Sequence, residues 1–423
     1  MTARRHKDGV YAADVLIVGA GFVGAAMAIA LDRAGISSVV VDAQDPARTL
    51  DDRFDGRAFA IARSSRRLLE GIGVWPDLES LAAPILDIRV SDAASPFFLH
   101  YDSEDAGEGT GGEGEPFGHM VRNVDLRRAL AERLANAGGA RLIAPARVVE
   151  LDRDAFGVAA TLGDGRTVRA RLAVAADGRN SAIRRDANIK VSGWSYDQAG
   201  IVCTVDHERS HDFVAHERFL PAGPFAILPL LGDPTDPGKR ASIVWTERAE
   251  LAPRIMALDD GDFAAELERR FGDFLGTVRV VGGRWSHPLS LQFAETQIAE
   301  RLALVGDAAH AMHPIAGQGL NMGLRDVAAL AEVAVDRMRL GLDIGDGVAL
   351  ATFQRWRRFD NALMLAMTDG LNRLFSNGVG PIKLARDLGL AAVNRMGPVK
   401  TFFTRHAMGT VGDLPRLMRG ETL

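Results

Sequence analysis

Residues 14–42 carry the pattern that most restricts how this chain can fold. An apolar run leads into a turn with Gly19, Gly21 and Gly24, then a run of small residues and a second apolar run that ends at Asp42. In such a GxGxxG turn the first glycine permits the bend, the second lets a pyrophosphate reach the backbone, and the third lets helix and strand pack closely. The acid after the second strand accepts hydrogen bonds from a ribose. The stretch predicts a βαβ unit that binds a dinucleotide; the alternative is a glycine-rich turn without a ligand.

A second succession of strand, acid and helix lies within residues 302–326. The apolar run there ends in Gly306-Asp307, and Gly317 and Gly319 leave room for a ligand to approach the backbone. Apolar residues at helical spacing follow directly, so a helix begins after the glycines. A carboxylate at a strand end, close to a helix N-terminus, suits a ligand that is partly hydroxylated and partly anionic. The alternative is an ordinary βα unit with a glycine-rich loop.

Two further features extend this pattern. The apolar run 172–176 closes with Asp177-Gly178, so a strand that ends in an acid beside glycine occurs twice in the chain. Arg57 follows the second strand of the βαβ unit, where an arginine reaches a pyrophosphate; the alternative is a surface arginine in a loop. Together with the GxGxxG turn, these features favour a nucleotide site over three unrelated turns.

The middle of the chain favours strands. Alternating or apolar runs punctuated by Pro and Gly predict an antiparallel sheet that roofs the cofactor. Residues 103–116, with five acids among glycines, predict a mobile surface loop, and residues 123–137 predict a helix with leucines on one face and arginines on the other. The predicted fold class is α/β: a Rossmann-like dinucleotide-binding domain with the GxGxxG unit, an interleaved antiparallel-sheet domain and a helical C-terminal segment. The predicted ranges are 1–84, 117–190 and 284–345 for the first, 85–116 and 191–283 for the second, and 346–423 for the third.

Composition excludes several classes of protein. The chain has 423 residues, 47% of them hydrophobic, and a formal net charge of −5, which together indicate a globular protein of two or three domains. No basic block suggests a nucleic-acid interface. The single cysteine, Cys203, excludes an intrachain disulfide and a CxxC site. The N-terminus has no secretory h-region, and no run of about 18 apolar residues occurs, so we expect a cytoplasmic protein.

Three motifs follow one another in this chain: the GxGxxG turn at Gly19, Asp177-Gly178 and Gly306-Asp307. Motifs of these kinds in this order resemble the class A flavoprotein aromatic hydroxylases, which have the fold of para-hydroxybenzoate hydroxylase. Residues 313–326, 356–376, 383–390 and 407–420 further resemble the ubiquinone-biosynthesis flavin hydroxylases. The resemblance covers nearly the whole chain. It implies an FAD-dependent monooxygenase that uses NAD(P)H and O2, through a flavin C4a-hydroperoxide, to hydroxylate the ring of a polyprenylated ubiquinone precursor.

The resemblance also assigns roles to individual residues. The residues that it places against FAD are Gly19, Gly21, Gly24, Asp42, Arg57, Asn123, Asp177, Gly306, Asp307, Gly317, Gly319, Leu320 and Asn321. Among them, Asp42 binds the adenosine ribose and Asp307 the ribityl chain, while Leu320 and Asn321 approach the isoalloxazine. Arg57 and Asp177 are also tied to NAD(P)H. The catalytic residue stays unknown, since the flavin carries the chemistry.

Two histidines near this site invite other interpretations. His310 and His313 have i, i+3 spacing, but no acid or cysteine completes a ligand set, so we expect no metal. His313 lines the active site or is a buried histidine bonded to backbone; both interpretations stay open. The enzymatic alternatives are a same-fold flavoprotein acting on a soluble phenol and a prenyl reductase. The non-enzymatic alternative is a subunit of a biosynthetic complex that works by protein contact.

The C-terminal segment differs in charge from the rest of the chain. Residues 354–423 hold 11 Lys and Arg against 5 Asp and Glu, a net of +6, so residues 1–353 carry −11. Such a basic, partly apolar segment suits an anionic membrane surface, from which a prenylated substrate is taken up. We therefore predict contact with the inner membrane or with other ubiquinone-biosynthesis proteins. The alternative is that these helices pack on the FAD domain with solvated arginines.

Overall fold

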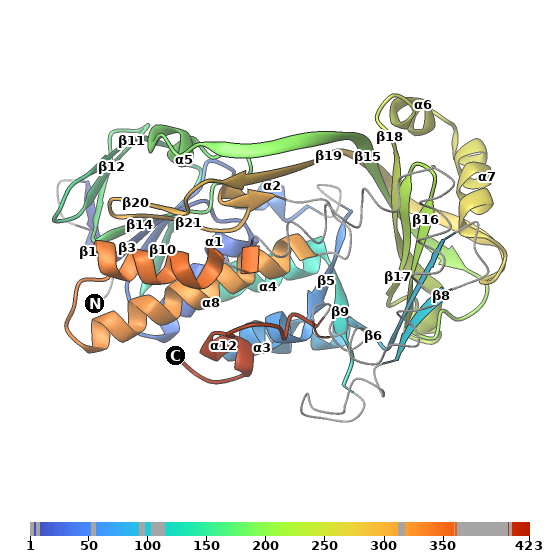
Figure 1. Ribbon diagram of the computed structural model, residues 1–423, viewed down its shortest axis with the longest axis horizontal. Coiled ribbons are helices and arrows are strands. Elements are labelled where there is room, and N and C mark those ends of the chain that lie inside the picture. Colours follow the sequence, from blue (N-terminus) through green and yellow to red (C-terminus); the bar gives the residue numbers. More distant parts are fainter. Residues whose placement is uncertain are drawn as a thin grey trace.

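The computed structural model describes residues 4–5, 9–51, 56–92, 98–102, 115–311, 318–358, 360–361, 405 and 408–423. Two units lie side by side in Figure 1, each built around a sheet. Beside the longer elements, the chain contains α2 (Pro46–Thr49), α3 (Arg63–Gly71), α5 (Ala182–Asp186) and α12 (Arg416–Arg419). Residues 347–358 are also helical. No helix in these ranges is long and apolar enough to cross a membrane.

The first unit contains a six-stranded sheet with the order β10-β4-β3-β14-β21-β20. All its neighbouring pairs are parallel except β20 with β21. Its strands are β10 (Ala140–Ile143), β4 (Ser38–Val41), β3 (Val15–Val18), β14 (Leu172–Ala175), β21 (Leu302–Leu304) and β20 (Ile298–Ala299).

Both faces of this sheet are buried, which is why its strands read as continuous apolar runs. Val15 and Ile17 of β3 pack with α1 (Phe22–Arg33), α4 (Asn123–Ala135) and α8 (Gln318–Arg339). Leu16 and Val18 point to the other face, where a five-stranded sheet covers them. The strands of that sheet, in order, are β1 (Arg4–Arg5), β2 (Val10–Ala12), β13 (Thr167–Ala170), β12 (Val158–Leu162) and β11 (Val148–Arg153).

The second unit contains an eight-stranded sheet with the order β22-β19-β15-β18-β17-β16-β7-β8. Only β16 and β7 pair in parallel. The strands are β22 (His310–Ala311), β19 (Val278–Ala294), β15 (Val191–His207), β18 (Arg240–Arg248), β17 (Gly223–Leu230), β16 (Val214–Leu220), β7 (Asp87–Asp92) and β8 (Phe98–Asp102). One face is covered by α6 (Ala252–Met256) and α7 (Asp260–Phe271). The opposite face packs on a three-stranded sheet of β5 (Ala58–Ala62), β9 (Gly118–Arg122) and β6 (Ala83–Ile85).

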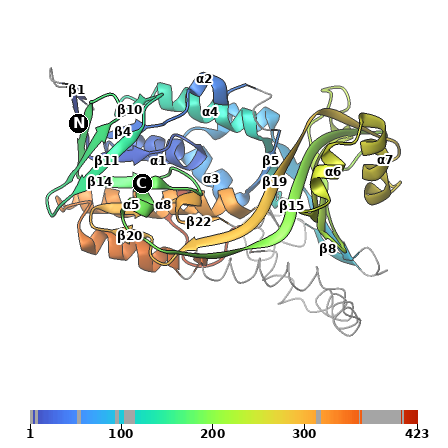
Figure 2. The ribbon, with the colours of Figure 1, turned by 90° about the horizontal axis from the view of Figure 1, so that it is seen from above.

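A two-stranded ribbon joins the units. Strands β15 and β19 have 17 residues each and pair from Val191 opposite Ala294 to His207 opposite Val278. Figure 2 shows them curving together from the first unit to the second. The predicted boundary between residues 283 and 284 falls inside β19, so no element ends there; the division into domains stays a prediction.

Several predicted elements shift at their ends. The helix expected at 123–137 ends at Ala135. Helix α7 begins at Asp260, because the Asp259 side chain accepts a hydrogen bond from the Asp262 backbone and caps it. The helix expected after the glycines begins at Gln318, within the glycine pair.

Cys203 is buried in β15, and burial raises the pKa of its thiol to about 12. Most of the predicted loop 103–116 and of the segment 354–423 lies outside the described residues.

Candidate FAD site

Four parallel strands end together at one edge of the six-stranded sheet. Val18 of β3 lies opposite Val41 of β4 and Ala175 of β14, and Ala175 lies opposite Leu304 of β21. Within three residues of these strand ends come Gly19, Asp42, Asp177, Gly306 and Asp307. The fold therefore gathers five predicted site residues from three distant parts of the sequence.

The glycines of the turn after β3 differ in their surroundings. A Cβ on Gly19, which has φ +104°, would overlap the carbonyl oxygen of Ala176, and a Cβ on Gly24 would overlap the carbonyl oxygen of Gly19. A Cβ on Gly21 would meet nothing within 4 Å. Gly19 and Gly24 thus serve close packing, whereas Gly21 leaves open space above the backbone, as a pyrophosphate requires.

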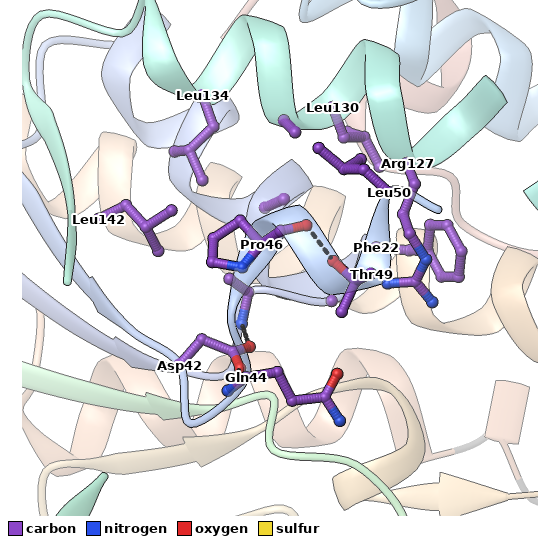
Figure 3. A pocket seen from close by; sticks show the side chains of 14 residues that line it. Phe22, Asp42, Gln44, Pro46, Thr49, Leu50, Arg127, Leu130, Leu134 and Leu142 are labelled. Carbon is purple, nitrogen blue, oxygen red and sulfur yellow. Dashed lines mark hydrogen bonds between the residues drawn. The ribbon is translucent and has the colours of Figure 1, made fainter. Parts of the chain in front are cut away.

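Asp42 links this turn to the next strand. Its carboxylate accepts hydrogen bonds from the backbone nitrogens of Ala20, at 2.5 Å, and Gln44, at 2.7 Å. Beside it lies a pocket between the start of α1, α2 and α4 (Figure 3). Leu130, Leu134 and Leu142 form an apolar wall of the pocket, and the polar lining residues are Asp42, Gln44, Thr49 and Arg127. An apolar wall with a few polar groups fits the adenosine end of a dinucleotide.

Two carboxylates at the sheet edge are available to a ligand. One oxygen of Asp177 caps α5 by accepting from the Ala182 nitrogen at 2.8 Å, while Oδ1 is buried and accepts no hydrogen bond from the described residues. Asp307 is exposed between buried Gly306 and Ala308, and it has no hydrogen bond or ion pair within the described part of the chain. Free carboxylate oxygens at a strand end suit the hydroxyl groups of a ribityl chain.

Helix α8 starts at this site. A Cβ on Gly319 would meet nothing within 4 Å, and Leu320 is half-buried beside it. The side chain of Asn321 accepts from the Ala62 nitrogen at 2.9 Å and donates to the Ala60 oxygen at 2.8 Å, so it fastens the helix to β5. We infer that Asn321 meets a ligand through its backbone, since its amide holds β5. The positive end of the 22-residue helix dipole favours negative charge there.

The pairing of β5 with β9 brings Arg57 and Asn123 to the same region. The Asn123 nitrogen donates to the Arg57 oxygen at 2.9 Å, and the Arg57 guanidinium lies 5.7 Å from the Phe59 ring centroid. Arg127 donates from Nε to Asn123 Oδ1 at 3.0 Å and lies 4.5 Å from the Phe22 ring centroid. The sequence prediction placed arginines on α4 but did not assign Arg127 to the site; no motif marks it.

A buried ion network behind the site was also missed. Asp326 is fully buried, and its Oδ2 accepts from the Gly306 nitrogen at 2.9 Å and from His310 Nε2 at 2.7 Å. Its Oδ1 accepts from Arg357 Nε at 2.7 Å. Burial acts to raise the pKa of Asp326, but His310 and Arg357 outweigh it and hold the pKa below its usual range. The network fixes the Gly306 turn. Asp326 and His310 lie in the run 302–326 and Arg357 in the run 356–376, but the sequence analysis did not pair them.

The remaining predicted residues fall outside the described ranges. Gly317 and His313 lie there, so their predicted roles stay predictions. His310 is described, and its ring is hydrogen-bonded to the Asp326 carboxylate.

Comparison with known proteins adds an independent line of evidence. The FAD binding domain family matches residues 12–335. Ubiquinone hydroxylase UbiL of Rhodospirillum rubrum is 55% identical over 414 residues, or 97% of this chain and 94% of that protein. The 3-demethoxyubiquinol 3-hydroxylase of Escherichia coli is 32% identical and covers 94% of this chain and 98% of its own. The human mitochondrial ubiquinone biosynthesis monooxygenase COQ6 is 30% identical, over 93% of this chain and 91% of its own.

Solved structures share the fold. The p-nitrophenol 4-monooxygenase PnpA of Pseudomonas putida has a TM-score of 0.76 at 19% identity, over 94% of this chain and 98% of its own. PqsL of Pseudomonas aeruginosa, in complex with 2-aminobenzoylacetate, has a TM-score of 0.73 at 23% identity, over 90% of this chain and 100% of its own. At these identities the likeness concerns the fold alone, and it confirms the predicted fold class.

Proposed function

This chain belongs to the FAD-binding family and, within it, to the ubiquinone-biosynthesis flavin hydroxylases, and we propose from this premise that it hydroxylates the ring of a polyprenylated ubiquinone precursor. The observation that carries the proposal is the sheet edge where Gly21, Asp42, Asp177 and Asp307 meet the start of α8. The open space over Gly21 and the carboxylate oxygens left free fit FAD.

Different residues of the site bind different parts of the cofactor. The glycine turn and the start of α1 receive the pyrophosphate, and the pocket of Figure 3 receives the adenosine end with Asp42 at the ribose. Asp307 holds the ribityl chain, and the backbone of Leu320 and Asn321 meets the isoalloxazine. When bound, FAD supplies the activation of O2 and the transfer of one oxygen atom to the ring.

The protein's own part is placement and electrostatics. The N-terminus of α8 stabilises negative charge on the bound group, because backbone N–H groups of its first turn point there. The Asn321 bonds to β5 keep this helix end in register with Arg57 and Asn123. We assign Arg57, together with Asp177, to the approach of NAD(P)H, as the family resemblance implies; Arg57 lies beside Asn123 and carries a positive charge.

Membrane contact belongs to the proposal as well. A prenylated substrate stays in the bilayer, and the net charge of +6 on residues 354–423 suits anionic lipid. Liposome flotation of the full chain, with and without anionic lipid, measures this contact. Equal flotation on neutral and anionic vesicles would contradict it.

The decisive experiment is mass spectrometry of the quinone pool in a strain that lacks this gene. We expect a prenylated intermediate that lacks one or more ring oxygens, and the missing oxygen identifies the ring position. Complementation with the intact gene restores ubiquinone, whereas complementation with D307A does not. Unchanged ubiquinone, both in the single deletion and in a double deletion with any second homologous hydroxylase gene, would overturn the substrate class.

A further inference from the structure

Strand β16 presents an acid to the interior of the second unit. Its residues alternate in direction, and Ala215 and Phe219 pack with the three-stranded sheet of β5, β9 and β6. Glu217 lies between them in the alternation, so it faces the same way. Figure 1 shows β16 and β17 between α7 on one side and β5, β9 and β6 on the other. Glu217 therefore points from the eight-stranded sheet toward the three-stranded sheet and the unit that carries the candidate FAD site.

The neighbours of Glu217 on this face are apolar. Val90 of β7 and Ala226 of β17 lie directly opposite it in the two adjacent strands. On β17 the other inward residues near it are Pro224 and Leu228, and on β7 and β8 the inward residues include Ile88, Leu99 and Tyr101. Among the described side chains on these strands, Tyr101 is the one other titratable group on this face.

The carboxyl of Glu217 is unpaired within the described part of the chain. It forms no hydrogen bond or ion pair with any described residue. Burial among these apolar neighbours raises its pKa to about 7. The residue as a whole is half-buried, so part of it stays accessible. An unpaired carboxyl in an apolar wall is destabilising, and this combination is typical of a group that meets a ligand.

A second set of polar groups lies on the same face. Val244 of β18 lies opposite Ala226, and Ser242 and Thr246 flank it with the same orientation. The Ser242 and Thr246 hydroxyls are buried and have no hydrogen-bond partner in the described ranges. Strands lie about 4.8 Å apart, so β16 and β18 are roughly 10 Å apart with only the small Ala226 between them. A carboxyl and two hydroxyls on one largely apolar face suit an aromatic ring that carries oxygen substituents.

We propose that Glu217 binds the ring hydroxyl of the phenolic substrate, which lies over Ala226 with its other oxygen substituents toward Ser242 and Thr246. The inference rests on the proposed function and adds the residue that orients the ring. The phenol O–H donates to a carboxylate oxygen of Glu217, and the bond is charge-assisted and therefore strong. Negative charge beside the hydroxyl raises electron density at the ring carbons ortho and para to it, where an electrophilic oxygen adds.

The test uses the FAD-loaded full chain and two probes, 2-geranylphenol and its methyl ether, which cannot donate a hydrogen bond. Dissociation constants are measured from flavin absorbance changes between pH 5.5 and 9. For the wild type we expect the phenol to bind about 10-fold more tightly at high than at low pH, and the ether to bind independently of pH. In E217Q the pH dependence disappears, and in E217L phenol affinity falls about 10- to 100-fold while ether affinity is kept.

A matched control comes from the opposite face of the same sheet. Glu247 of β18 is also buried, but it pairs with Arg270 at 3.3 Å, so E247Q leaves both dissociation constants and the pH dependence unchanged. Persistence of the pH dependence in E217Q, or an unchanged ratio of phenol to ether affinity in E217L, would overturn the role of Glu217. If neither probe binds the wild type and no hydroxylated product forms, the proposed function fails instead.

Discussion

Single residues at the candidate site divide into those that shape the backbone and those that meet a ligand. Gly19 and Gly24 are packed against carbonyl oxygens, whereas Gly21 faces open space at φ −65°, a value that any L-residue adopts. Glycine therefore serves close packing at two positions of the turn and leaves space for a ligand at a third. Substitutions can distinguish these two roles.

Replacing Gly21 by valine should leave the fold intact and abolish cofactor binding. We expect apoprotein G21V to melt within a few degrees of the wild type while its FAD affinity falls by at least about 100-fold, because a side chain fills the space of the pyrophosphate. G24V should instead melt well below the wild type, since its side chain overlaps backbone. The exposed Gly138, whose Cβ would meet nothing, provides the control G138V. Normal FAD binding by G21V contradicts the assignment.

Glu217 predicts a pH dependence of stability. Its folded pKa of about 7 lies above the ordinary value of 4.5, so the folded state favours the protonated acid. The stability that this preference gives is complete below pH 4.5 and is lost as the pH rises toward 7. E217Q stays neutral, so it should match the wild type near pH 4.5 and exceed it by up to about 3 kcal/mol at pH 8. Urea unfolding at both pH values measures this difference, and a gap that is constant with pH refutes it.

At the scale of elements, the close packing of Gly323 sets how near α8 lies to α1 and to the Gly306 turn. A Cβ on Gly323 would lie 2.6 Å from Val23 Cγ2 and 3.3 Å from the Gly306 Cα. The helix thus approaches α1 and the Gly306 turn as closely as it does only because position 323 has no side chain. That approach aims its N-terminus at the sheet edge.

Substituting Gly323 by alanine should push α8 away from α1. We expect G323A to lose about 1–3 kcal/mol in the free energy of unfolding, by overpacking, and to bind FAD more weakly. Removal of the opposing methyl groups in G323A/V23A should restore much of both. Thermal melts and flavin titration of the two single variants and the double variant form a cycle. If V23A brings no recovery, the contact with Val23 does not set the helix position.

At the scale of the whole molecule, distant segments meet behind the candidate FAD site. Arg357 in the helix at residues 347–358 is buried and donates to Asp326 at 2.7 Å, to Asp360 at 2.8 Å and to Asn361 at 2.8 Å. Asp326 in turn holds the Gly306 nitrogen. The start of the C-terminal segment is thereby connected to the turn that carries Asp307.

Loss of Arg357 should therefore weaken both fold and cofactor binding. R357M leaves the Asp326 carboxylate buried with one partner fewer, which costs roughly 3–5 kcal/mol in the free energy of unfolding at pH 7. FAD affinity should fall with it, because the Gly306 turn loses its support. The adjacent Arg358 is exposed, so R358M is the matched control and should behave as wild type. Equal melting temperatures for both variants would show that the network contributes nothing measurable.

The sequence alone determined the local units, because their signals lie within a few residues. The GxGxxG turn with Asp42, the strand ends at Asp177 and Asp307, and the helix after the glycines all follow from short-range spacing and glycine conformation. The resemblance of the C-terminal segment supplied the family, and the comparisons confirm it.

Only the tertiary structure decided which side chains share a site. Strand register placed Asp42, Asp177 and Asp307 along one edge, although up to 265 positions separate them. Arg357 met Asp326 because two helices pack against each other, and no local pattern encodes that pairing. Glu217 reads in sequence as an ordinary polar residue of a strand. The face it occupies, and hence its apolar neighbours Val90 and Ala226, depends on strand pairing with β7 and β17.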